Sequence, residues 1–69
     1  MKTTIKGHIV SFDEEAHNGV RYLLYQIDWQ EAKVFFNEAH RHNSAVFEDH
    51  FGTKFKLIHH GGEYQLEKI

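Results

Sequence analysis

The clearest pattern of apolar and polar positions along the chain lies between residues 28 and 43. At about 100° per residue, most of its apolar side chains fall on one side of a helix and most polar side chains on the other. Val34 is the apolar exception, because it points to the polar side. Asp28 followed by Glu31 is a capping-box pattern at the start, and Asn43 tolerates the left-handed conformation that ends many helices. We therefore predict a helix over residues 29–42. Its expected buried face comprises Trp29, Ala32, Phe35, Phe36 and Ala39.

The N-terminal part of the chain has patterning typical of a β-hairpin. Residues 3–12 are the first predicted strand and residues 20–27 the second, and a change of apolar parity near residue 9 indicates a bulge. Asn18-Gly19 between the two strands is a strong signal for a two-residue type I′ turn. That turn aligns four apolar residues in two cross-strand pairs, Val10 with Ile27 and Phe12 with Tyr25.

Two further turn signals follow the predicted helix. His50-Phe51-Gly52 suits a three-residue hairpin loop, and Gly61-Gly62 suits a two-residue turn. The registers that these turns impose agree on which residues share a face of the sheet. The apolar face contains Ala45, Phe47, Phe55, Leu57, Tyr64 and Leu66. The opposite face contains the charged residues Glu48, Lys54, Lys56 and Glu67.

The predicted elements occur in the order strand, strand, helix, strand, strand, strand. We expect an α+β fold in which an antiparallel sheet of about five strands has one helix packed on its apolar face. A spatial strand order of 2-1-5-4-3 obeys the usual rules for connections. With 69 residues the chain is expected to form a single domain over residues 1–69.

Composition narrows the class of protein. The chain has no Cys, so it has no disulfide, and its six Phe, three Tyr and one Trp must supply much of the core. The absence of Cys fits a reducing compartment. No apolar stretch is long enough to span a membrane, and the first residues lack the apolar core of a signal peptide. We therefore expect a cytoplasmic protein that does not associate with a membrane.

The charge balance argues against a nucleic-acid partner. Eight Lys and Arg residues are distributed among ten Asp and Glu residues, for a net charge of −2, whereas duplex-binding proteins present a basic patch or stripe. The predicted strands also carry lysines and aromatic residues, and aromatic side chains on a sheet can stack on the bases of a single-stranded nucleic acid. Binding of single-stranded nucleic acid is therefore the alternative. Acidic residues lie on the same solvent-exposed sheet face as these lysines. An alternation of acidic and basic side chains is typical of a sheet face that contacts only solvent.

Seven His residues raise the question of a metal site. His40 and His42 lie roughly 200° apart around the predicted helix, and His59 and His60 point to opposite faces of a strand. The chain has no HExxH motif and no Cys ligand. A site assembled in space from more distant His residues stays an alternative, but no metal ligand is predicted.

Catalytic signals are absent from the sequence. The acidic residues lie beside predicted turns, Ser11 and Ser44 lack a nucleophile motif, and no glycine-rich phosphate loop is present. One sheet and one helix also leave little room for a deep pocket. We therefore predict that the protein is not an enzyme, with no catalytic residues and no cofactor.

Protein contact is the function class that these exclusions favour. We predict a small cytoplasmic, non-enzymatic binding or regulatory module that contacts another protein or a second copy of itself. The alternative is a nucleic-acid-binding or metal-binding accessory protein. A terminal strand at 45–49 is suited to strand addition. Apolar residues outside the predicted core are the candidate contacts: Val34, Phe51, Tyr22, Leu24 and Ile58.

Overall fold

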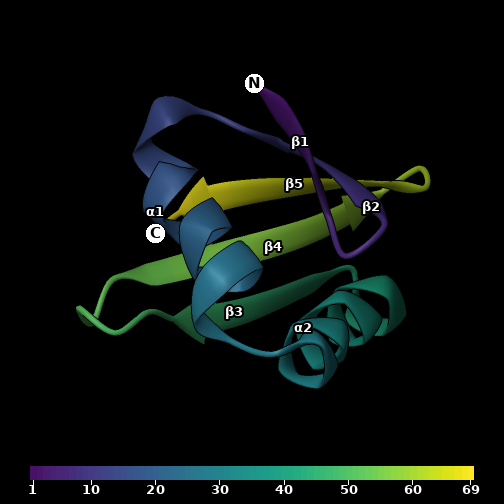
Figure 1. The fold of residues 1–69 in the computed structure, drawn as a ribbon. Helices are drawn as coiled ribbons and strands as arrows, with labels where there is room; N and C mark the ends of the chain where they lie inside the picture. The colour runs from purple at the N-terminus through teal and green to yellow at the C-terminus, as the bar shows by residue number, and fades with distance from the viewer.

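A computed structural model describes residues 1–69 as a five-stranded sheet with helical segments (Figure 1). The strands are β1 (Lys2–Ile5), β2 (His8–Phe12), β3 (Ser44–Glu48), β4 (Lys54–His60) and β5 (Glu63–Lys68). Between β2 and β3 the chain forms η1 (Glu14–Ala16), α1 (His17–Arg21), η2 (Tyr22–Gln26) and α2 (Trp29–His42). The α+β class is confirmed, but the chain has an N-terminal helical segment over residues 14–26 in addition to the predicted helix.

The sheet is mixed, so the prediction of a purely antiparallel sheet is wrong. Its strand order is β1-β2-β5-β4-β3, and β2 runs parallel to β5 while the other neighbours are antiparallel. Parallel neighbours need a long crossover connection, and the helical residues between β2 and β3 supply much of it. The predicted order differs because residues 20–27 do not form a strand.

The two C-terminal hairpins have the predicted registers. Phe47 is opposite Phe55, and Leu57 lies between Ala45 and Leu66. All five side chains are buried. Turn residues and strand parity were therefore sufficient to define this half of the sheet.

Helix α2 begins and ends at the predicted residues. The Asp28 carboxylate accepts a hydrogen bond of 2.8 Å from the Glu31 backbone N–H. At the other end Asn43 adopts the left-handed conformation, with φ of 72°. These caps satisfy backbone groups that a helix end leaves without partners.

The predicted hairpin about Asn18-Gly19 is wrong. The chain turns instead at Lys6-Gly7, where φ values of 51° and 84° are the left-handed pair that a type I′ turn requires. This turn, and not a bulge, accounts for the change of apolar parity near the start of β2. None of the cross-strand pairs predicted for the Asn18-Gly19 hairpin forms, because residues 14–26 are helical.

Gly19 brings the N-terminal helical segment close to the sheet. A Cβ atom added there would lie 2.8 Å from the Phe55 ring and 3.1 Å from the Leu66 side chain. The absence of a side chain therefore permits this approach. The buried apolar residues of the same segment are Ala16, Val20 and Leu23.

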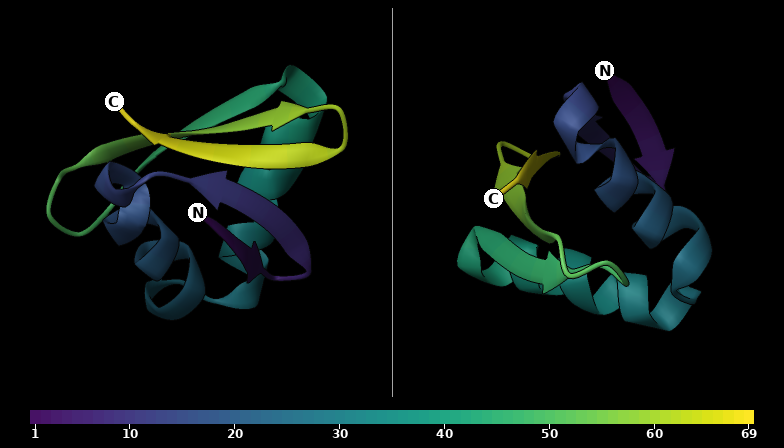
Figure 2. Two further views of the ribbon diagram at one scale, coloured as in Figure 1. Left: turned by 90° about the horizontal axis from the view of Figure 1, so that it is seen from above. Right: turned by 90° about the vertical axis from the view of Figure 1, so that its left-hand side faces the viewer.

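The predicted apolar face of α2 is only partly buried. Ala32, Phe36 and Ala39 are buried, and the Phe36 ring packs against Tyr64 with centroids 4.9 Å apart. Trp29, in contrast, is 58% exposed, so its predicted place in the core is wrong. Phe35 of α2 packs against Phe47, and Gly19 of α1 lies against Phe55 on the same sheet face. The opposite sheet face therefore carries no helix. Figure 2 shows α1 beside the sheet and α2 crossing near its β3 end.

We predict opposite effects of alanine at two adjacent positions. Asn18→Ala should raise the free energy of unfolding by about 0.5 kcal/mol, because Asn18 is an exposed helical residue and Ala favours the helix. Gly19→Ala should lower it by about 1–3 kcal/mol, because the new Cβ overlaps the Phe55 ring. Urea denaturation measures both. Destabilisation by Asn18→Ala would contradict the helical assignment, since a type I′ turn favours Asn there.

Candidate functional site

The predicted contact residues do not form one surface. Val34 is exposed on α2, and Phe51, at the tip of the β3–β4 hairpin, is 82% exposed. Tyr22 and Leu24 are partly buried and pack against the core, since the segment that contains them is helical. Ile58 is partly buried on β4, on the sheet face that carries no helix. The structure therefore does not bring these five residues together as a patch.

Tyr22 has a structural role that strand parity did not predict. Its ring stacks on the Phe47 ring with centroids 5.7 Å apart and meets the His50 ring edge-on at 5.4 Å. It thereby links the N-terminal helical segment to the β3–β4 hairpin. This contact removes most of Tyr22 from the surface on which a partner could bind.

Strand β3 lies at one edge of the sheet, as predicted for the terminal strand. Its backbone pairing with β4 is defined at both ends. The Asn43 carbonyl accepts a hydrogen bond of 2.9 Å from the His59 N–H, and the Asp49 N–H donates one of 3.0 Å to Thr53. Hydrogen-bonded pairs alternate along an antiparallel ladder. The N–H and C=O groups of Ser44, Val46 and Glu48 therefore point away from β4.

The side chains of the same three residues lie on the sheet face without a helix. Val46, the central one, is 56% exposed, although it is apolar. Glu48 is exposed beside it and is paired across the sheet with Lys54. The edge of β3 thus offers unpaired backbone groups together with an exposed apolar side chain, which is the combination that promotes strand addition.

The opposite edge of the sheet is less suited to a partner strand. β1 has four residues, and the pairing of Met1 with Phe12 leaves Lys2 and Thr4 facing outward. Short edge strands and edge lysines are common protections against unwanted pairing. β3 has neither a Lys nor a Pro along its outward side, so it is the better candidate.

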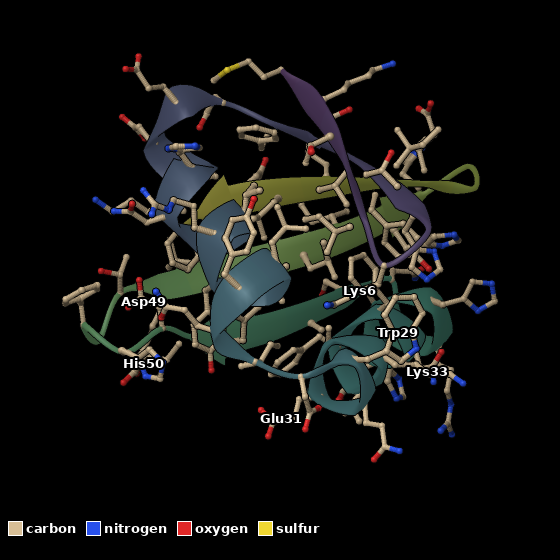
Figure 3. The ribbon with its side chains drawn as sticks, viewed as in Figure 1. Lys6, Trp29, Glu31, Lys33, Asp49 and His50 are labelled. Carbon is tan, nitrogen blue, oxygen red and sulfur yellow. The ribbon has the colours of Figure 1, made fainter.

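The loop that follows β3 is held in place by a buried acid. Asp49 is nearly inaccessible, and its Oδ1 accepts hydrogen bonds of 2.9 Å from the Phe51 and Thr53 backbone N–H groups. Figure 3 shows Asp49 and His50 together at this end of the molecule. Asp49 is therefore a structural residue of the hairpin loop, and its hydrogen bonds fix the backbone at Phe51.

Two histidines contact the Tyr64 ring, and a third contacts one of them. The His59 and His8 rings lie 5.0 Å and 5.1 Å from the Tyr64 ring, and His40 lies 4.7 Å from His59, measured between ring centroids. The sequence did not predict this aromatic cluster, in which His59 and Tyr64 are cross-strand partners. No group of three or more His, Cys, Asp or Glu side chains in the structure is placed to hold a metal ion.

Comparison with protein-family models, curated proteins and solved structures finds no significant match to this chain. No helix of the structure has the length and apolar character needed to cross a membrane. The functional assignment therefore rests on the residues of this chain.

Ionisation of Tyr64 should lower stability at alkaline pH. Burial raises the pKa of Tyr64 above the ordinary value of 10.0, so the folded state holds the phenolic proton more tightly than the unfolded state. This contribution to stability is complete below pH 10 and is lost as pH rises through the folded-state pKa. We predict that Tyr64→Phe will make the free energy of unfolding fall less steeply above pH 10.

Urea denaturation between pH 8 and pH 12 tests this prediction, with Tyr25→Phe as the matched control. Tyr25 is 76% exposed, so Tyr25→Phe removes a hydroxyl group at the surface and not one in the core. Equal steepness in the Tyr64→Phe variant and the wild type would show that another group causes the alkaline loss.

Proposed function

We propose that the protein is a small non-enzymatic contact module whose β3 edge pairs with the β3 edge of a second copy. The observation that carries this proposal is the alternation of the β3 backbone, which leaves Ser44, Val46 and Glu48 without sheet partners on their outer side. An antiparallel partner strand satisfies these groups in the same way as a strand within the sheet.

A second copy fits this edge because β3 is self-complementary. With a two-fold axis at Val46, the Val46 side chains of the two copies meet, and their backbones exchange N–H···O=C hydrogen bonds. Ser44 of each copy then lies opposite Glu48 of the other, so that no like charges face each other. The hydroxyl of Ser44 can donate a hydrogen bond to the Glu48 carboxylate in this register.

The size of the edge predicts a weak association. β3 has five residues, which is too short to bury the approximately 1,200–2,000 Å² of a standard stable interface. We expect a dissociation constant between about 10 µM and 1 mM. Association of this strength makes the dimer sensitive to protein concentration, which suits a regulatory contact.

Charge placement supports contact with protein over contact with nucleic acid. On the sheet face without a helix, Lys56 is paired with Glu67, and Lys54 with Glu48. A phosphate backbone would meet alternating charges there and would release few counterions. The acids with defined partners, Asp28 and Asp49, cap a helix and a loop, and this supports a non-enzymatic role.

We predict that Val46→Lys abolishes dimerisation. At the two-fold axis this substitution places two ammonium groups opposite each other, where like charges destabilise strand pairing. Because Val46 is exposed, its substitution should preserve the fold. Sedimentation velocity from about 10 µM to 1 mM measures the association. A wild type that stays monomeric at the highest concentration would contradict the proposal.

Thr4→Lys is the matched control, because Thr4 is an outward-facing residue of the other edge strand, β1. This variant should dimerise like the wild type. Amide hydrogen exchange provides the second measurement. The N–H groups of Val46 and Glu48 should become protected as protein concentration rises, and that of Thr4 should not. Equal loss of association in both lysine variants would assign the effect to net charge and overturn the pairing at β3.

A further inference from the structure

A small cavity lies between the β1–β2 turn and residues 29–37 of α2. Its volume is about 220 Å³. The lining residues are Lys6, His8, Trp29, Lys33 and Asn37. Figure 3 shows Lys6, Trp29 and Lys33 side by side at this end of the molecule. The size is below the range of about 300–1,000 Å³ that is typical of sites for drug-sized ligands, so a ligand would be small.

The lining of the cavity is suited to an anion. Lys6 and Lys33 contribute two ammonium groups, and Asn37 contributes a carboxamide that can donate hydrogen bonds. No Asp or Glu lines the cavity, although the chain has ten of them and a net charge of −2. The two cations therefore have no carboxylate partner within the cavity, and they create a positive potential in an acidic protein.

Lys6 occupies a backbone position that another residue would fill at lower cost. Its φ of 51° is left-handed, and type I′ turns favour Asn or Gly at such a position. Its Nζ lies over the Trp29 ring, 5.3 Å from the centroid. A strained residue at the rim of a cavity is often retained for its side chain. Here that side chain places a cation beside an exposed indole.

Trp29 adds an apolar surface to the same cavity. The side chain is 58% exposed although it belongs to the apolar face of α2. It lies one helical turn from Lys33, and Asn37 lies one turn further, so that all three line the cavity from one side of the helix. A ligand that meets this row would contact an aromatic ring at one end and hydrogen-bond donors along the rest.

We propose that this cavity binds a small phosphate monoester that carries a planar or apolar group. The phosphate lies between Lys6 and Lys33 with Asn37 donating to an oxygen, and the organic group lies against Trp29. Two separate ammonium groups match the two charges of a phosphate dianion, to which Lys binds as a point charge. A monocarboxylate carries only one charge. This activity is independent of dimerisation, because no residue of β3 lines the cavity.

Trp29 is the only Trp of the chain, so its fluorescence reports on the cavity directly. The probes are phenyl phosphate, inorganic phosphate and benzoate, each titrated at constant ionic strength. We expect a saturable change in emission with phenyl phosphate, weaker binding of inorganic phosphate, and weaker binding of benzoate. Amide chemical shifts at residues 6–8 and 33–37 provide a second readout. The absence of a saturable change by both methods would overturn the proposal.

Lys6→Asn separates ligand binding from folding. Asn favours the left-handed turn, so this variant should keep or raise the melting temperature while its affinity for phenyl phosphate falls about tenfold or more. Lys33→Gln should lower the affinity by a similar factor. Lys54→Gln and Lys56→Gln on β4 are the matched charge controls, and their affinity should not change. Equal losses in the control variants would assign the binding to net charge, and an unchanged affinity in Lys6→Asn would rule out the cavity.

Discussion

The contact of Gly19 with Phe55 and Leu66 is the constraint on which the arrangement of the chain depends. It allows the N-terminal helical segment to lie directly on the sheet, where Ala16, Val20 and Leu23 complete the core. With that segment on the inner side, β2 can run parallel to β5, because the chain returns to the sheet only after a helical crossover. The same crossover delivers α2 to the start of β3, so that β3 is left as a free edge.

The sequence predicted the C-terminal half of the fold and failed in the N-terminal half for a physical reason. After residue 28, the capping residues define the helix, and the two hairpin turns define strand registers that agree with each other. At Asn18-Gly19, the turn signal competes with a helical spacing of Ala16, Gly19, Val20 and Leu23. The prediction attributed Gly19 to its conformational freedom, whereas the structure uses its small size. Only the tertiary contact with Phe55 distinguishes the two explanations.

The candidate sites were predictable to different extents. The edge position of β3 follows from its place at the start of a strand meander, so sequence reasoning found it. Tyr22 and Leu24 were assigned to the surface because strand parity was applied to residues that are helical. For Trp29, helical periodicity predicts which side of the helix carries the side chain. It does not predict that the core ends before the first turn of the helix, which leaves Trp29 exposed. The overlooked signal was Gly7, which marks the turn that places Lys6 beside Trp29.

The cavity and the β3 edge have no residue in common, but helix α2 lines the cavity and also packs against β3. Lys6 and Lys33 approach the cavity from the β1–β2 turn and the first half of α2. The same helix touches β3 through Phe35, whose ring lies 5.2 Å from that of Phe47. A ligand that stabilises the first turns of α2 can affect the pairing of β3 through this packing and through Asn43, which joins the end of α2 to β3. Because packed cores resist small displacements, the two proposed activities should be nearly independent, and coupling between them would have to come from movement of α2 as a whole.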